Sequence, residues 1–312
     1  MPPWVIVGPG DDAAVLKPVR GAFDVLTTDV QVEGIHFDRR FVPPDAIGHR
    51  ALAVNLSDLA AMGARPRVAL LSLMLPDALP VADVDAILDG LLALAADTQT
   101  ALVGGNITRS PGPLVVDVTA VGSVARRKVL GRGGARPGDE VYLTGAIGAA
   151  RAGLAMLQAG ATADDRFSAG CRARYLRPVP RVRIGGQLGR VRAASACMDL
   201  SDGLADAVRQ VCEASGVGAL IEAGALPIDP GARTWSEAHG EDAVRAAVQG
   251  GDDYELLFTV PRRFRGRLRT VRAIAGDVAI TRIGAITRER DIRLRHDGRD
   301  EPWPSGFEHF VC

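Results

Sequence analysis

The chain has 312 residues, 47% of them hydrophobic, which is enough for two domains with ordinary cores. Its 37 basic residues balance 37 acidic residues, which argues against a nucleic-acid partner bound through a positive field. No apolar run approaches the ~20 residues of a membrane span, and Met1-Pro2-Pro3-Trp4 does not begin a signal peptide. We therefore expect no membrane partner. The four cysteines form no CxxC pair, so we expect reduced thiols and a cytoplasmic protein.

In the first half, short apolar runs predict strands that lead into polar, acidic segments. These predicted strands cover residues 5–7, 23–26, 68–75, 102–103 and 114–124. Helical spacing of apolar residues predicts helices over residues 45–62 and 83–97, and Gly63 ends the first of them. Asp58 shares the apolar face of that first helix, where a charge is more often a ligand or a paired group than a solvated one.

Residues 126–138 are basic, glycine-rich and poor in apolar side chains, so we interpret them as a linker. The predicted domains are residues 1–128 and 129–312. In the second domain, strands are expected over residues 141–143, up to 198 and 255–260, and helices over residues 148–158, 182–188 and 204–215. Strands and helices alternate irregularly, so the fold class is mixed α/β, with an α+β arrangement as plausible as a doubly wound one.

The most informative segment is Asp199-Leu200-Ser201-Asp202-Gly203, where a short apolar run leads into two carboxylates and a hydroxyl. Asp199 and Asp202 are three residues apart, so they point the same way if a helical turn begins there. Clustered carboxylates repel one another unless a cation offsets the charge, and such hard oxygen ligands suit Mg²⁺ or Ca²⁺. Ser201 or an Asp is equally suited to cap the next helix, and we expect capping and metal binding together.

Acidic groups also follow apolar runs near the N-terminus, in Gly10-Asp11-Asp12, in Thr27-Thr28-Asp29 and at Asp58. The first is equally typical of a plain turn and the second of a solvated strand end. Because such groups occur in both halves, they indicate one metal-rich site that faces a polyphosphate.

Two glycine-rich segments are ambiguous. Gly104-Gly105-Asn106 permits the close backbone approach that a phosphate loop needs, but it is also an ordinary turn. Gly145-Ala146-Ile147-Gly148 lacks the full GxGxxG spacing, so we discount a dinucleotide site. The chain has no Walker GxxxxGK[ST] motif and no protein-kinase HRD or DFG set, so any ATP site belongs to another fold.

Taken in order, the motifs resemble those of the thiamine-monophosphate kinase family, in the superfamily of aminoimidazole ribonucleotide synthetase and selenophosphate synthetase. The matching segments run from residue 8 nearly to the C-terminus: residues 8–12, 27–29, Gly34-Ile35-His36-Phe37, residues 51–63, residues 199–203 and Gly250-Gly251-Asp252-Asp253-Tyr254-Glu255-Leu256. The resemblance implies two mixed α/β domains, an active site in the cleft between them and a homodimer. It also implies transfer of the ATP γ-phosphoryl group to thiamine monophosphate, with several Mg²⁺ ions.

The resemblance assigns roles to individual residues. Mg²⁺ ligands would be Asp12, Thr27, Thr28, Asp29, Asp58, Asn106, Asp199 and Asp202. ATP contacts would be Gly105, Asn106, Arg132 and Ser201, with Arg132 and Asp199 as catalytic residues. Thiamine monophosphate contacts would be His36, Asp252 and Phe307. The acceptor is already an anionic phosphate, which agrees with the absence of a strong general base.

Two departures from the family pattern bear on activity. Asn106 stands where the family usually has a metal-binding Asp, so we expect a higher Mg²⁺ requirement, and Asp252 stands where Glu is common. The missing charge at Asn106 leaves open a non-catalytic protein that binds thiamine phosphate or nucleotide. A second alternative is that the chain is another ATP-using member of the superfamily. Selenophosphate synthetase is disfavoured because no Cys lies near the N-terminus, and a role in purine synthesis is disfavoured by Gly34-Ile35-His36-Phe37.

Overall fold

The computed structural model describes residues 1–10, 12–161 and 166–306. The chain divides into two compact units: residues 1–59 with 64–127, and residues 60–63 with 128–312. Among the described residues, no helix combines the length and the hydrophobicity that a membrane crossing requires. Among the described residues, Cys171, Cys197 and Cys212 are buried and form no disulfide.

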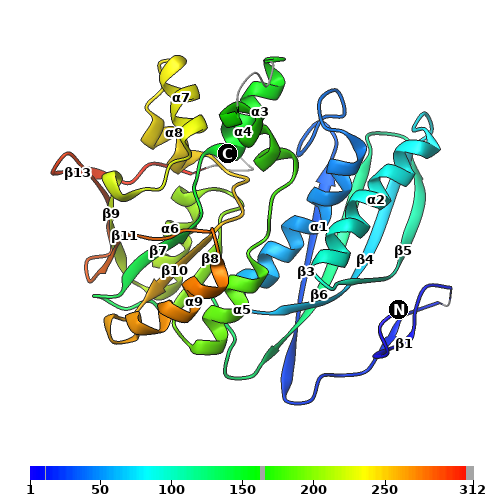
Figure 1. Cartoon of the computed structure of the whole chain (residues 1–312), viewed down its shortest axis with the longest axis horizontal. Helices are drawn as coiled ribbons and strands as arrows, with labels where there is room; N and C mark the ends of the chain where they lie inside the picture. Colours follow the sequence, from blue (N-terminus) through cyan, green and yellow to red (C-terminus); the bar gives the residue numbers. More distant parts are fainter. Residues whose placement is uncertain (11, 162–165, 307–312) are drawn as a thin grey trace. The chain divides into compact units, whose positions relative to one another are not determined.

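The first unit is a four-stranded sheet with helices on one face (Figure 1). Its strand order is β3-β6-β4-β5, in which only the β4–β5 pair is parallel, and β1 pairs with β2 separately. The elements are β1 Val5–Val7, β2 Val15–Leu16, β3 Ala22–Val32, α1 Pro44–Ala61, β4 Arg65–Pro76, α2 Val81–Asp97, β5 Ala101–Ser110 and β6 Val115–Ala125.

Close packing of α1 on α2 depends on two glycines. A Cβ added to Gly48 would lie 1.8 Å from the Ile87 carbonyl oxygen, and one added to Gly90 would lie 1.8 Å from the Asp45 carbonyl oxygen. The helix backbones therefore touch where any larger residue would separate them. Both helices begin and end within two residues of the bounds expected from the sequence.

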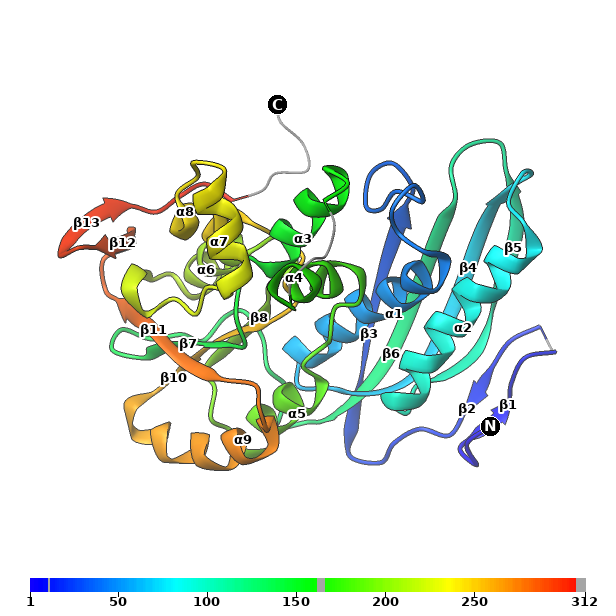
Figure 2. The same ribbon diagram turned by 45° about the horizontal axis from the view of Figure 1, so that its top comes forward.

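The second unit is a seven-stranded sheet with helices on both faces, which Figure 2 shows most clearly. The strand order is β13-β12-β9-β11-β7-β10-β8, and only β12–β9 is parallel. Its strands are β7 Glu140–Thr144, β8 Ala196–Asp199, β9 Gly218–Glu222, β10 Leu256–Val260, β11 Ile280–Thr287, β12 Ile292–His296 and β13 Arg299–Pro302. Its helices are α3 Ala149–Gln158, α4 Arg166–Leu176, α5 Val182–Val191, α6 Leu204–Ser215, α7 Pro230–Ala238, α8 Ala243–Gln249 and α9 Leu268–Ala275, with 3-10 turns η1 Ala223–Ala225 and η2 Arg262–Arg267.

Successive side chains of β10 point to opposite faces of the sheet, and each face has its own hydrophobic core. Leu257 packs into a cluster that includes α6, whereas Leu256 and Phe258 pack into a second cluster that includes α5 and α9. The expected apolar face of α6 is confirmed, because Leu204, Ala207, Val208 and Val211 are all buried.

The strands predicted over residues 23–26 and 102–103 were both too short. The strand expected over residues 23–26 continues as β3 to Val32, so Thr27, Thr28 and Asp29 lie within the strand and not at its end. The ordinary-turn alternative for Gly104-Gly105-Asn106 is also wrong, because these residues continue β5. Pairing with β4 through an irregularity opposite Ala69 and Leu70 holds the glycines in the sheet despite their low strand propensity.

Candidate active site

Two loops of the second unit, distant in sequence, lie side by side. One is the segment from Asp199 to Gly203 between β8 and α6, and the other is residues 250–255 before β10. The Asp252 amide donates to the Ser201 carbonyl (2.8 Å), and the Tyr254 amide donates to the Leu200 carbonyl (3.0 Å). These backbone bonds bring together four residues that the sequence assigned to the site: Asp199, Ser201, Asp202 and Asp252.

Glycines permit this approach of one loop to the other. Gly203 has a φ of +89°, and a Cβ there would lie 2.2 Å from the Gly250 carbonyl oxygen. A Cβ on Gly251 would lie 2.7 Å from the Ser201 carbonyl oxygen. The N-cap of α6 is Gly203 and not the Ser or Asp expected from the sequence, so the cap residue itself offers no side-chain acceptor. The first amides of α6 thus have no side-chain partner from the cap, and the end of this helix favours an anion.

The acids of the loop pair differ in exposure. Asp199 is 3% exposed at the end of β8, whereas Asp202 and Asp252 are half-buried. Asp252 and Tyr254 both have positive φ values, +66° and +50°, and the Tyr254 hydroxyl donates to Asp252 Oδ1 at 3.0 Å. A tyrosine in the left-handed region is strained, and such strain is typical of functional loops.

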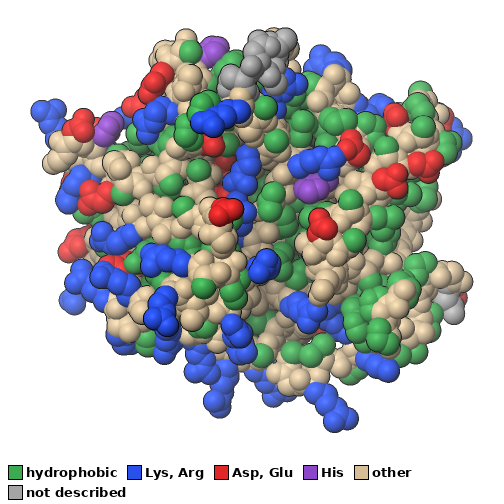
Figure 3. Space-filling model, viewed as in Figure 1, with side chains coloured by type: hydrophobic (Ala, Val, Ile, Leu, Met, Phe, Trp, Pro, Cys, Tyr) green, Lys and Arg blue, Asp and Glu red, His purple; other side chains and the backbone are tan. Residues whose placement is uncertain are grey.

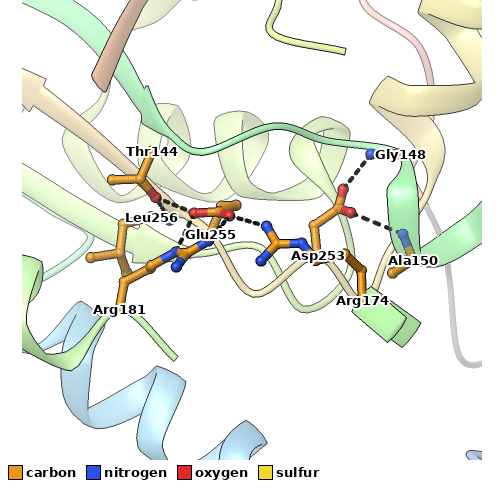
Figure 4. Close-up of polar contacts among 8 residues, drawn as sticks. All are labelled: Thr144, Gly148, Ala150, Arg174, Arg181, Asp253, Glu255 and Leu256. Carbon is orange, nitrogen blue, oxygen red and sulfur yellow. Dashed lines mark hydrogen bonds and ion pairs between the residues drawn. The ribbon is translucent and has the colours of Figure 1, made fainter. Parts of the chain in front are cut away.

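The sequence analysis gave no role to two buried carboxyls of the loop of residues 250–255, Asp253 and Glu255 (Figure 4). Glu255 accepts from Thr144 Oγ1 at 2.6 Å and from Arg181 Nε at 2.7 Å, and Arg174 also reaches it. Burial alone would raise the pKa of Glu255, but these partners hold it below its usual value. The available signal was two acids directly before the apolar run of β10.

Asp253 joins the loop to the start of α3. Its carboxyl accepts from the Gly148 amide at 2.8 Å and the Ala150 amide at 3.4 Å (Figure 4). Burial raises the pKa of Asp253 to about 7, despite those two amides. The nearby Gly145 makes room for Glu255, because a Cβ added to Gly145 would lie 2.1 Å from Glu255 Oε1. The glycines at 145 and 148 therefore accommodate two carboxyls of this loop.

Arg132 is exposed and attached to α6. Its guanidinium donates to Gln210 Oε1, and Gln210 Nε2 in turn donates to Asp206 in the first turn of the helix. The Trp303 indole donates to the Ala205 carbonyl at 2.9 Å, so the segment before Gly306 also lies along this turn. Phe307 lies outside the described residues.

In the first unit, Thr27 and Asp58 meet across the interface of β3 with α1. Thr27 Oγ1 donates to Asp58 Oδ2 at 2.5 Å. Asp29 lies two residues further along β3 and shares the helix-covered face with Thr27. The unusual position of Asp58 is thus explained by a polar group on the sheet.

Thr28 points to the opposite face of the same sheet. Its hydroxyl donates to Asp117 Oδ1 at 3.2 Å and lies 3.1 Å from Thr119 Oγ1, both on β6. The threonine pair that the sequence grouped together is therefore divided between two faces.

Asn106 is separated from Asp29 by the width of the sheet. Asp29 pairs with Val118, Val118 with Leu71 and Leu71 with Gly105, the neighbour of Asn106. Three strand spacings amount to about 14 Å. One ion with bonds of about 2.1 Å does not span that distance, so Asn106 and Asp29 of one protomer do not share an ion.

The remaining predicted residues lie on loops of the first unit. His36 closes the turn after β3, where its Nδ1 accepts from the Val32 amide at 3.0 Å. Asp12 is exposed, and its neighbour Asp11 lies outside the described residues.

The candidate metal ligands share one donor chemistry. Among the described residues, no three His, Cys, Asp or Glu side chains come close enough to form a metal cluster. The paired groups Thr27 and Asp58 are both oxygen donors, as are Asp29, Asp199 and Asp202. Oxygen donors of this kind fit Mg²⁺ and do not fit a thiophilic metal.

Comparison with known proteins identifies the class that this architecture represents. The family model "AIR synthase related protein, N-terminal domain" matches residues 10–124, and "AIR synthase related protein, C-terminal domain" matches residues 136–297. Both mixed α/β domains are thus of the AIR synthase related type.

Individual relatives narrow the class. The thiamine-monophosphate kinase of Escherichia coli K12 is 40% identical, over 98% of this chain and 93% of that protein. The crystal structure of thiamine-monophosphate kinase from Stenotrophomonas maltophilia K279a is 39% identical with a TM-score of 0.86, covering 96% of this chain and 93% of that one. A structure described as AaThiL complexed with AMPPCP and TMP is 33% identical with a TM-score of 0.83, covering 94% and 89%. The chain belongs to the thiamine-monophosphate kinase family.

Proposed function

We propose that this chain transfers the γ-phosphoryl group of ATP to the phosphate of thiamine monophosphate, giving ADP and thiamine diphosphate. The observation that carries the proposal is the loop pair of residues 199–203 and 250–255, which backbone hydrogen bonds hold together at the start of α6. A relative of the same fold is described in complex with AMPPCP, an ATP analogue, and with TMP, which we take as thiamine monophosphate.

The α6 end of the loop pair is assigned to ATP. The first amides of the helix and the Ser201 hydroxyl provide donors for phosphate oxygens. Arg132 is exposed near the same helix and adds a guanidinium fork that matches a phosphate. Gly105 and Asn106, on the exposed edge strand β5, are assigned to the nucleotide as well.

The carboxylates are assigned to magnesium. The proposed ligands are the oxygen donors Asp12, Thr27, Thr28, Asp29, Asp58, Asn106, Asp199 and Asp202. When bound, Mg²⁺ offsets the charge of two polyanionic substrates. The protein side chains orient the phosphates, and no general base is required because the acceptor oxygen is already anionic.

The acceptor is assigned to His36, Asp252 and Phe307. The backbone of Asp252 is held beside Ser201, one of the proposed ATP donors, and its carboxylate accepts from the Tyr254 hydroxyl. This arrangement brings an acidic group near the cationic thiazolium ring and leaves the acceptor phosphate free to face ATP.

We also infer a homodimer formed through the open face of the four-stranded sheet. Leu26, Val30 and Leu70 share that face and are 67%, 44% and 40% exposed. Exposed apolar side chains gathered on one sheet face favour a protein partner. A second copy also offers a way for Asn106 to act with acids that are about 14 Å away within its own chain. Sedimentation of Leu26→Asp tests this, because the charge opposes a dimer through this face.

The reducing cytoplasm is the proposed location. The three described cysteines form no disulfide, and ATP is the proposed co-substrate.

The test is a panel of acceptors mixed with purified protein, ATP and Mg²⁺, with products separated by chromatography. Thiamine diphosphate is expected only with thiamine monophosphate, and Asp199→Asn should reduce it by about 100-fold or more. Turnover with another acceptor would indicate a different superfamily activity. Tight binding of thiamine monophosphate without ADP formation would favour a non-catalytic binding protein.

A further inference from the structure

A hollow of about 500 Å³ lies at the start of β7, against η2 and β11. It is lined by Glu140, Arg262, Arg265 and Arg282. The four-residue step from Glu140 to Thr144 along β7 spans about 13 Å. The hollow is therefore at the opposite end of that strand from the Thr144–Glu255 bond, and it forms no part of the proposed active site.

A buried carboxylate fixes two of the arginines. Glu140 is 2% exposed and accepts from the Tyr142 hydroxyl and from Arg265 Nε, both at 2.9 Å. Arg282 Nε lies 3.4 Å from the same carboxylate. The bond from Arg265 holds the pKa of Glu140 below its usual value, so the group stays ionised and anchors both cations.

The positive charge exceeds what Glu140 requires. Arg265 alone pairs with both carboxylate oxygens. Within the described part of the chain, the side chain of Arg262 forms no hydrogen bond or ion pair, and Arg282 forms only its ion pair with Glu140. The side chains of Arg265 and Arg282 remain 59% and 47% exposed. Three guanidinium groups against one carboxylate leave a net charge of about +2.

The surrounding sequence strengthens this field. Six arginines and no acid occur in residues 262–272: Arg262, Arg263, Arg265, Arg267, Arg269 and Arg272. Figure 3 shows basic side chains gathered over the region of α9. Of these six, Arg262 and Arg265 line the hollow, where Arg282 of β11 joins them, and this convergence of three guanidinium groups distinguishes a site from a basic surface.

We propose that this hollow binds a small anion that carries a diphosphate group. Guanidinium forks match phosphate oxygens. The fork of Arg262 and that of Arg282, which has only its ion pair with Glu140, match two phosphate groups, and the volume suits a small molecule. Free pyrophosphate and a nucleoside diphosphate share this chemistry.

Calorimetric titration of the full chain with inorganic pyrophosphate, in EDTA without divalent metal, tests the proposal. The variant R262Q/R282Q removes the two forks assigned to the ligand, together with the Arg282–Glu140 ion pair, and leaves Arg265 on Glu140. The control R263Q/R269Q removes the same charge from the same segment but spares the hollow. We expect R262Q/R282Q to weaken binding by about tenfold or more, and the control by less than about twofold. Melting curves check folding, and R262Q alone, which breaks no contact, should still weaken binding several-fold.

A second titration with ADP distinguishes the sources. Tighter, equally Arg262-dependent binding of ADP would identify a nucleotide, and weaker binding would identify free diphosphate. No binding to the natural chain, equal weakening by both double variants, or full binding in R262Q/R282Q would overturn the proposal.

Discussion

The two units present their candidate residues in different ways. In the first unit, five of the candidate residues stand on strands β3 and β5, and alternation along β3 decides that Thr27 and Asp29 face α1 while Thr28 faces away. In the second unit, Asp199, Ser201, Asp202 and Asp252 stand on two loops that backbone bonds hold together. Side-chain chemistry should therefore dominate in the first unit, and backbone shape in the second.

The largest expected effect tests side-chain chemistry in the first unit. Asp58→Asn keeps the size of the side chain and an acceptor for Thr27, but it removes the charge assigned to Mg²⁺. We expect kcat to fall by about 100-fold or more, measured as ADP release with thiamine monophosphate. The control Asp89→Asn changes an exposed acid of α2 and should alter kcat less than about twofold. Equal activity in the two variants would remove Asp58 from the site.

The next effect tests backbone shape in the second unit. Gly203→Ala adds a Cβ 2.2 Å from the Gly250 carbonyl oxygen, at a φ that favours glycine. We expect the KM for ATP to rise by about tenfold or more and unfolding free energy to fall by about 1–3 kcal/mol. Gly224→Ala is the matched control, because its Cβ would meet open space. A Gly203→Ala variant with unchanged KM would show that the loop approach is irrelevant to ATP.

The buried carboxyls sharpen the contrast through pH. The pKa of Asp253 rises from 3.8 to about 7 on folding, so its contribution to stability is complete below about pH 4 and is lost as pH rises through 7. Asp253→Asn removes this titration. In urea unfolding, the natural chain should lose about 2 kcal/mol or more relative to the variant between pH 4.5 and 8. Asp277→Asn, an exposed control, should leave the profile unchanged, and a parallel profile for Asp253→Asn would contradict the assignment.

The smallest effect concerns the edge strand β5. Asn106→Asp adds the carboxylate that the resemblance to the family leads us to expect at this position. We expect the Mg²⁺ concentration for half-maximal rate to fall by about three- to tenfold, with little change in kcat. An unchanged Mg²⁺ dependence would exclude Asn106 as the cause of a higher metal requirement.

Local sequence patterns predicted the elements that have strong periodicity. Helices α1, α2 and α6 were predicted because their apolar residues repeat along one face, and β6 because apolar residues alternate along its sequence, which the alternating burial of the strand matches. Helices α4 and α9 were not predicted, because arginines interrupt the apolar pattern in both. The continuation of β5 through Gly104 and Gly105 depends on pairing with β4, which local propensity does not contain.

The same limit applies to the candidate site. The loop motifs were visible because acids and glycines cluster in the sequence, and Ser201 and Asp252 do come together. The buried state of Glu255 was not visible, because its partners Arg174 and Arg181 lie more than 70 residues away. The separation of Thr28 from Thr27 followed only once both residues were known to lie within β3, beyond the end of the predicted strand.

The most direct test of the central claim follows the γ-phosphoryl group itself. The protein is incubated with γ-labelled ATP, Mg²⁺ and thiamine monophosphate, and the labelled products are quantified. We predict that the label enters thiamine diphosphate in a one-to-one ratio with ADP, without free labelled phosphate. Label recovered as free phosphate, or as pyrophosphate with AMP, would contradict direct transfer and the function proposed for this site.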